Sequence, residues 1–273
     1  MSDQTTALRL SGRDVLPLLH RTTSNALADL VPGMARATLF CDFRGRLLHR
    51  AVVAMASDAA VWLLRDDAPG AELAAAVDRM VFRDDVRIED RSAEFTVRRD
   101  LVESAPQATF RTLDSGVHAP LTAATGDGTT YTTEPGEALA DEARIEALIP
   151  GHGHEVAEAF NPYEVGLAAE VHLAKGCFTG QEALQRLITY DSVRRRPVHV
   201  RLPGLRRAVA TGEPLDVFAA GERAGLLTRI AGLNGFAILR RDALANAAPF
   251  ALEDGSVLEI VSAPELARPL GRP

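Results

Sequence analysis

The chain of 273 residues is long enough to bury a substantial core in one large or two modest domains. Its apolar content of 47% and charged content of 25% are ordinary globular values, which excludes disordered, collagen-like and small disulfide-stapled proteins. The 30 basic and 37 acidic residues give a net charge of −7, so no global basic field exists to hold nucleic acid without sequence preference. The run Arg194-Arg195-Arg196 still allows a local basic patch.

The compartment can be predicted from two features of the sequence. The N-terminus lacks the basic and apolar regions of a signal peptide, and the longest apolar stretch, residues 51–64, is too short for a membrane span. The two cysteines, Cys41 and Cys177, form no CxxC pair, which excludes zinc ribbons and disulfide frameworks and favours a reducing compartment. We therefore expect a cytoplasmic protein with no membrane and no direct nucleic-acid partner.

The first part of the chain alternates strand-like and helix-like patterns. In chain order, the patterns predict a strand over 7–10, a helix over 13–19 with Ser11 as its cap, strands over 35–41, 47–56 and 60–65, a helix over 71–82, and strands over 86–88 and 93–97. Gly45 suits the turn of the first hairpin. This order indicates an α+β fold with mixed or antiparallel sheets.

The pattern of apolar residues changes twice in the rest of the chain. Residues 103–135 are poor in long apolar runs, with a hairpin turn predicted at Asp127-Gly128, and helices are expected over 135–148 and from Thr179. Short strand-like runs then predict a small antiparallel β-barrel, at 198–202, 215–218, 225–230, 235–239 and 257–261. We place a boundary at residue 195, between a first region, 1–195, and a barrel, 196–273.

The use of basic residues singles out one position. Of the 30 basic residues, 29 are arginine, and the exception is Lys175. Arginine serves at a generic surface site, whereas lysine supplies a compact ammonium that can lose its proton. Chance is the alternative explanation, but this lysine lies beside a Gly-Cys step whose pattern suggests burial.

Residues 175–182, Lys-Gly-Cys-Phe-Thr-Gly-Gln-Glu, carry the most informative pattern. Thr179 and Glu182 fit a capping box at the start of a helix. Cys177 would then lie two residues before the cap, where the helix dipole and Lys175 favour a thiolate. A reactive thiol at Cys177 is one interpretation, and a buried inert cysteine is the other.

Several common catalytic motifs are absent from the sequence. No GxGxxG, GxxxxGK[ST], HExxH or GxSxG pattern occurs, so dinucleotide, P-loop, zincin and α/β-hydrolase functions lack their usual support. His152, His154 and His172 raise the question of a metal site. No carboxylate or cysteine completes an obvious ligand set, so we favour a solvent-facing loop and assign no metal ligand.

The segment 175–182 resembles the K-G-C-[YF]-x-G-Q-E motif of the YgfZ-type folate-binding proteins, relatives of the glycine-cleavage T-protein, an aminomethyltransferase. Four further stretches, each weaker, extend the likeness over most of the chain, at 10–18, 37–46, 144–150 and 221–228. The resemblance implies a two-lobed folate-binding fold with a C-terminal barrel, and tetrahydrofolate or a one-carbon derivative as cofactor. It also implies iron–sulfur proteins or cluster-assembly factors as partners, and an indirect effect on tRNA modification.

The resemblance assigns roles to individual residues. Cys177 and Lys175 would be the working thiol and its tuning amine. Arg144 and Glu146 match positions near the folate pocket of the T-protein, where a carboxylate pairs with pterin N–H groups and an arginine holds a carboxylate or carbonyl. An ordinary ion pattern on a helix face is the alternative for this pair. Gly176 and Gln181 of the motif complete the expected folate-binding set.

The sequence also departs from the T-protein pattern. There, the glycine turn leads into a strand that carries an aspartate, whereas residues 45–52 contain no carboxylate. Three functions therefore stay open: a folate-binding accessory protein for iron–sulfur cluster assembly or repair, a folate-dependent aminomethyl- or methyltransferase, and an interaction module without ligand. The transferase would need another group, such as His49 or Glu146, and Cys177 could act as cluster ligand, nucleophile or redox contact.

Overall fold

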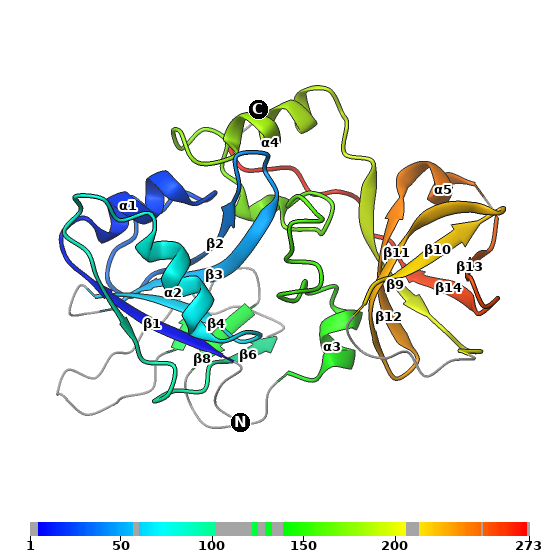
Figure 1. Ribbon diagram of the computed structural model, residues 1–273, viewed down its shortest axis with the longest axis horizontal. Helices are drawn as coiled ribbons and strands as arrows, with labels where there is room; N and C mark the ends of the chain where they lie inside the picture. The colour runs from blue at the N-terminus through cyan, green and yellow to red at the C-terminus, as the bar shows by residue number, and fades with distance from the viewer. Residues whose placement is uncertain are drawn as a thin grey trace.

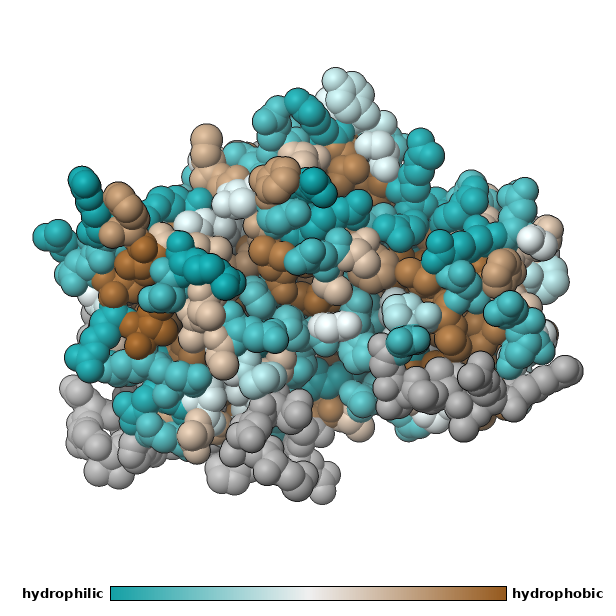
Figure 2. All heavy atoms as spheres, in the orientation of Figure 1, coloured by the Kyte–Doolittle hydropathy of each residue, from teal (hydrophilic) through white to brown (hydrophobic). Residues whose placement is uncertain are grey.

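The computed structural model describes residues 5–56, 60–101, 122–124, 129–132, 139–205, 213–246 and 248–271. A β-sheet with helices on one face lies at one end of the molecule and a β-barrel at the other, with α3 and irregular chain between them (Figure 1). The predicted α+β class with antiparallel sheets and a closed barrel is confirmed. On the face shown in Figure 2, hydrophilic residues cover most of the described surface, as expected when apolar side chains fill the cores.

The larger sheet is antiparallel, with strand order β2-β3-β4-β1-β5. Its strands are β1 (Thr6–Ser11), β2 (Ala35–Cys41), β3 (Leu47–Met55), β4 (Val61–Arg65) and β5 (Arg87–Asp90). α1 (Val15–Thr22) and α2 (Gly70–Asp78) cover one face, where leucines of the strands and helices form a core. Because side chains alternate along a strand, the same strands bury a second set of residues on the opposite face.

The hairpin between β2 and β3 turns as predicted at Gly45. This glycine has φ 73°, and its N–H donates to the carbonyl of Asp42 at 3.0 Å. The side chain of Asp42 accepts from the backbone N–H of Arg44 and of Arg46, at 2.8 and 2.7 Å. An Asx-type turn therefore fixes the hairpin, and the carbonyl of Asp42 faces the neighbouring helix.

One predicted strand is wrong. Residues 93–97 form a turn and irregular chain, and β6 begins only at Arg98. Phe95 and Val97 nevertheless pack on the second face of the sheet, and the Phe95 ring meets Trp62 edge-on at 5.8 Å. The alternation of apolar residues in this segment thus reflects packing against the sheet, and residues 93–97 form no strand.

A small sheet of order β6-β8-β7 follows, from β6 (Arg98–Leu101), β7 (Thr122–Ala124) and β8 (Thr129–Thr132). The turn predicted at Asp127-Gly128 lies outside the described residues. The helix predicted over 135–148 is described over α3 (Asp141–Glu146), after which Leu148 and Pro150 lead into irregular chain.

The barrel closes in the order β10-β11-β12-β9-β14-β13, so each of these six strands pairs with a neighbour on both sides. Its strands are β9 (Arg195–Arg201), β10 (Leu215–Ala219), β11 (Glu222–Ala231), β12 (Asn234–Arg240), β13 (Phe250–Leu252) and β14 (Val257–Ser262), with α5 (Arg241–Ala245) after β12. The chain then leaves the barrel: the Leu270 N–H donates to Val171 O at 2.7 Å, and the Leu173 N–H donates to Leu270 O at 2.9 Å. Leu270 is therefore back in contact with the first region.

A central core joins the sheet to the barrel. Phe160 and Tyr163, from the irregular chain after α3, are buried against the β2–β3 hairpin and against Phe236 of the barrel. The short 3₁₀ helix η1 (Ala168–Glu170) and the helix α4 (Gln181–Thr189) complete this core. Within the described residues, no helix is long and apolar enough to cross a membrane.

Replacement of Phe236 tests how much this central core contributes to stability. Phe236→Ala should lower the free energy of unfolding by about 3–5 kcal/mol, since a fully buried phenylalanine is lost and a cavity remains. Phe82→Ala is the matched control, because Phe82 is 85% exposed, and it should change stability by less than about 0.5 kcal/mol. Urea denaturation of both variants checks this, and equal losses would contradict it.

Candidate functional site

The helix after the Lys-Gly-Cys motif begins in a way that differs from the prediction. Gly180 is the N-cap of α4, with φ 85°, and no side chain caps the helix. The predicted Thr179/Glu182 capping box is therefore wrong, and Glu182 instead pairs with Arg186 one turn later at 2.6 Å. A Cβ at position 180 would lie 2.5 Å from Asp42 O, so close packing on the β2–β3 turn decides how the helix starts.

The motif exposes its cysteine. Cys177 is exposed together with Gly176, so the alternative of a buried, inert cysteine at this position is wrong. The buried cysteine is Cys41 in β2, and burial raises the pKa of its thiol to about 12. Of the two thiols, only Cys177 is therefore accessible to a reagent or a partner.

Lys175 is held between the motif and α1. Its ammonium donates to the carbonyl of His20 and lies 4.9 Å above the centre of the Phe178 ring. Partial burial lowers the pKa of Lys175 to about 8, and the nearby Cys177 opposes this shift. The amine is thus partly neutral just above neutral pH, unlike a surface lysine.

Two further contacts fix the same loop. The backbone N–H groups of Leu27 and Ala28 point at Nδ1 of His20, so the proton of this imidazole belongs on Nε2, which donates to Lys175 O at 3.1 Å. Gln181 Nε2 donates to Leu173 O at 2.9 Å. These hydrogen bonds fix the segment that leads into α4. This segment and the first residue of the helix bring together Lys175, Gly176, Cys177 and Gln181.

Arg144 and Glu146 lie in α3, away from the loop that carries Cys177, and their side chains contact different parts of the molecule. Arg144 is buried and donates to Asp66 Oδ2 at 2.6 Å and to Leu139 O at 3.1 Å. Burial by itself would raise the pKa of Asp66, but Arg99 and Arg144 outweigh burial and lower it. Glu146 is exposed and accepts from Asn234 of the barrel at 3.1 Å.

A cavity of about 450 Å³ opens between the larger sheet, residues 147–150 and η1. Basic, acidic and apolar side chains line it together, among them Arg36, Arg50, Arg99, Leu148, Leu167 and Glu170. Arg50 donates from Nε and Nη2 to Glu170 Oε1, at 2.9 and 2.6 Å, in a pair that is nearly enclosed. Arg99 donates to Asp66, so Asp66 connects the cavity wall to Arg144.

Sequence reasoning missed Arg50, Arg99 and Glu170. The available signal was a charged residue on an otherwise apolar face of the predicted strand, since Arg50 shares its face with the buried Val52 and Ala54. Arg99 and Glu170 gave no such signal, because their partners are 33 and 120 residues away along the chain.

A second polar cluster forms on the other face of β3. The rings of His49 and His152 stack at 5.5 Å, and Arg65 Nη1 lies 3.4 Å from Nδ1 of each. Burial and Arg65 lower the pKa of His49 to about 4 and also lower the pKa of His152. Both rings are therefore neutral at pH 7 and accept from Arg65.

This cluster could in principle hold a metal ion. Ligand atoms of His49, Glu72 and His152 lie within 4.8 Å of one another. The Arg65 guanidinium, however, lies 3.4 Å from the Nδ1 atom of each ring and places a positive charge beside the cluster, which opposes the binding of a cation. We therefore interpret the cluster as a pair of neutral imidazoles that hold Arg65, in preference to a metal site. Its members come from β3, α2 and the 152 turn, and do not include His154 or His172.

Comparison with known proteins settles the fold. No protein-family profile matches the chain. The crystal structure of the glycine cleavage system aminomethyltransferase T from Bartonella henselae superposes with a TM-score of 0.72 and 14% identity, over 95% of this chain and 83% of that one. The chain has the aminomethyltransferase fold.

Sequence relatives agree over shorter stretches. A chloroplastic protein of Arabidopsis thaliana, described as a transferase, is 33% identical over 92 residues, which are 34% of this chain and 20% of that protein. An aminomethyltransferase of Moorella thermoacetica is 39% identical over 90 residues, 32% of this chain and 23% of that one. The chain thus matches about a fifth of the length of these relatives, and the specific likeness to YgfZ-type proteins stays a prediction.

The environment of Lys175 can be tested directly because it is the only lysine. After reductive ¹³C-methylation, the resonance of Lys175 should titrate with a midpoint near pH 8 in the folded protein, because burial disfavours the ammonium. The same resonance in urea should titrate near the ordinary value of about 10.4. A folded-state midpoint near 10.4 would contradict the placement of this side chain.

The lowered pKa of Lys175 also makes the free energy of unfolding depend on pH. The unfolded chain binds more protons than the folded chain between the two pKa values of Lys175, so its contribution to stability rises with pH from about 8 to about 10.4. Lys175→Met should remove this part of the pH dependence.

Proposed function

We propose that this protein binds tetrahydrofolate, or a one-carbon derivative of it, in the cavity of about 450 Å³ between the larger sheet and η1. The observation that carries the proposal is an open, arginine-lined cavity between the larger sheet and η1 of an aminomethyltransferase fold. Its volume lies in the range of small-molecule sites. Its position lets both the sheet and the chain after α3 contact one ligand.

The chemistry of the lining fits a folate. Tetrahydrofolate combines a pterin that carries amide and amino groups, an aromatic ring and a glutamate with two carboxylates. Guanidinium groups suit the carboxylates, although Arg36 pairs with Asp29 at 2.6 Å and would have to exchange this partner for the ligand. The Arg50–Glu170 pair offers polar atoms to a pterin. Leu148 and Leu167 supply the apolar wall that a ring needs.

One unpartnered group lies behind the cavity wall, on Arg144, which does not itself line the cavity but is joined to Arg99 through Asp66. Among the described residues, Nη1 of Arg144 is enclosed and donates to no acceptor, whereas its Nη2 holds Asp66 beside Arg99. A buried donor without an acceptor is costly, so a carbonyl or carboxylate of a ligand that reached behind Arg99 would be stabilised by this donor. The role predicted for Arg144 in folate binding rests on this donor, while Glu146 would have to leave Asn234 to take part.

For the biological role, we propose an accessory protein of iron–sulfur cluster assembly or repair that supports tRNA modification indirectly. The support is the likeness of residues 175–182 to the YgfZ-type motif, together with the exposure of Cys177. An exposed cysteine can reach a partner protein, and cysteine is an established iron ligand in iron–sulfur clusters. Iron–sulfur proteins or assembly factors are the partners this role requires.

A folate-dependent aminomethyl- or methyltransferase is the second candidate. The fold and the aminomethyltransferase relatives favour it. Against it stands the chemistry of β3, where His49 and Arg50 lie in the stretch that has no carboxylate. His49 points to the face opposite the cavity, and Glu170, an acidic group of the cavity wall, is paired with Arg50. No described group on β3 is therefore placed as a free carboxylate base.

Calorimetric titration with tetrahydrofolate under reducing conditions tests the binding. The wild type should bind saturably, and the double variant Arg50→Gln/Glu170→Gln should bind at least about tenfold more weakly, because charge-assisted contacts are lost. Changing both partners avoids leaving one buried charge unpaired. Arg87→Gln on the exposed side of β5 is the control and should leave binding unchanged.

Two outcomes would overturn the folate proposal: no saturable binding, or equal binding by the double variant and the wild type. The first would favour an interaction module without ligand. Addition of an aminomethyl donor to the bound complex then separates the two roles. An accessory protein should form no methylenetetrahydrofolate above the buffer rate, whereas turnover would favour the transferase.

A further inference from the structure

The turn that ends α3 forms part of the wall of the proposed folate cavity. The Leu148 N–H donates to the carbonyl of Ile145 at 3.0 Å, and the next N–H, of Ile149, donates to the carbonyl of Arg144 at 2.8 Å. These bonds define a Schellman motif, in which the residue after the C-cap adopts a left-handed conformation and is usually glycine. Here the C-cap is Ala147 and the residue after it is Leu148, with φ 49°. A leucine thus occupies a position whose backbone favours glycine.

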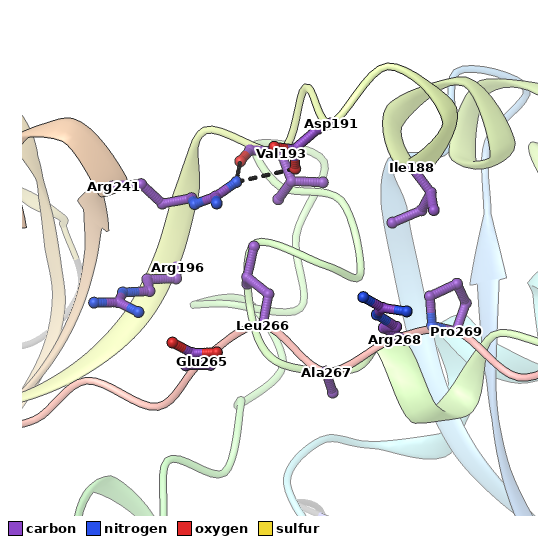
Figure 3. Close-up of a pocket in the computed structure, with 10 residues that line it drawn as sticks. All are labelled: Ile188, Asp191, Val193, Arg196, Arg241, Glu265, Leu266, Ala267, Arg268 and Pro269. Atoms are coloured by element: carbon purple, nitrogen blue, oxygen red, sulfur yellow. Dashed lines mark hydrogen bonds and ion pairs between the residues drawn. The ribbon is translucent and has the colours of Figure 1, made fainter.

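Two other described residues, glycine aside, have a positive φ, and both have an ordinary explanation. Asp191, with φ 44°, lies at the same position after α4, beside a hollow of about 630 Å³. Aspartate tolerates this conformation, and the carboxylate pairs with Arg241 at 3.2 Å (Figure 3). Ala220, with φ 50°, lies beside Gly221 in the tight turn between β10 and β11 and is small and exposed. Within the described chain, Leu148 is therefore the one large side chain in this conformation.

The barrel holds this turn from behind. Arg229 of β11 donates from Nη2 to the carbonyl of Ile149 at 2.6 Å and pairs with the buried Glu155 at 3.0 Å. Glu155 also accepts from the backbone N–H of Gly151 at 2.9 Å. A residue in a costly backbone conformation persists only where its surroundings fix it, and these contacts fix the chain directly after Leu148.

The side chain of Leu148 is divided between the core and the cavity. It packs on the central core, but it is only half-buried, and it lines the cavity. Its neighbours Ile145 and Ile149 supply the enclosed contacts of this turn, with exposed fractions of 0% and 8%. A costly backbone conformation together with an apolar side chain left partly open at a cavity indicates a contact with a ligand.

We propose that Leu148 is a specificity-determining residue of this cavity, because its side chain covers a ring of the bound folate. The inference rests on the proposed function, since it takes the ligand to be a folate. A ligand with carboxylates and no ring would use the arginines and leave Leu148 uncovered. The cavity therefore selects ligands in which a flat ring accompanies the anionic groups.

Calorimetric titration of Leu148 variants with tetrahydrofolate under reducing conditions tests this contact. Leu148→Ala should raise the Kd about tenfold or more, because the ring loses apolar surface to cover. Leu148→Met keeps an apolar side chain of similar volume and should bind within about threefold of the wild type. Leu187→Ala is the matched control, because Leu187 is also half-buried and packs on the same core but does not line the cavity. It should leave the Kd within about twofold.

Leu148→Gly separates the backbone from the side chain. Because glycine adopts a positive φ without strain, Leu148→Gly should have a higher urea midpoint than Leu148→Ala, the reverse of the usual order of these residues. Its affinity for tetrahydrofolate should be as low as that of Leu148→Ala, since both lack the leucine side chain. A lower urea midpoint for Leu148→Gly than for Leu148→Ala would overturn the strain on which the inference is built.

Three further results would count against the proposal. Equal affinity of Leu148→Ala and the wild type, or an equal loss in Leu187→Ala, would overturn the role of Leu148 and leave the proposed function standing. N-acetylglutamate, which has two carboxylates and no ring, should bind Leu148→Ala no more weakly than it binds the wild type, and weaker binding would overturn the ring contact. No saturable binding of tetrahydrofolate by the wild type would overturn the proposed function itself, and this inference with it.

Discussion

The apolar contact of the chain after α3 with both β-units holds this molecule together. Phe160 and Tyr163 bury their rings between the β2–β3 hairpin and Phe236 of the barrel, in a region with little regular secondary structure. Without this core, the larger sheet and the barrel would have no shared apolar contact. The polar cavities lie where this core gives way to charged side chains, so their shapes depend on it.

Charge inside the protein is organised around guanidinium groups. Asp66 joins Arg99 to Arg144, Glu170 accepts two bonds from Arg50, and Glu164 accepts from Arg195. Buried pairs of this kind add little net stability, because desolvation opposes the attraction, but they fix side chains in place. The planar guanidinium group, with its several donors, is well suited to that task. This is a physical role for arginine in a chain that has 29 arginines and one lysine.

Periodicity predicted most of the fold, because most elements bury one face. The strands of the larger sheet, the turn at Gly45 and the barrel strands follow from alternation and turn residues. Predictions failed where a distant contact decides the local structure. The start of α4 depends on the closeness of Gly180 to Asp42, and the segment 93–97 is apolar because it packs beneath a sheet. Neither contact is visible in a local window of sequence.

The candidate sites were predictable to different degrees. Residues 175–182 are contiguous, so the sequence could group Lys175 with Cys177, whose exposure only the structure shows. The cavity wall joins Arg50 to a residue 120 positions later. Arg144 and Glu146 are near neighbours in the sequence, yet they point to different units.

Hydrogen–deuterium exchange with and without tetrahydrofolate tests the central claim most directly, because it locates a ligand without mutation. The account predicts slower exchange in β3, in residues 147–150 and in η1, with no change in the C-terminal segment 265–269. Protection confined to other parts of the chain, or none at saturating tetrahydrofolate, would contradict it.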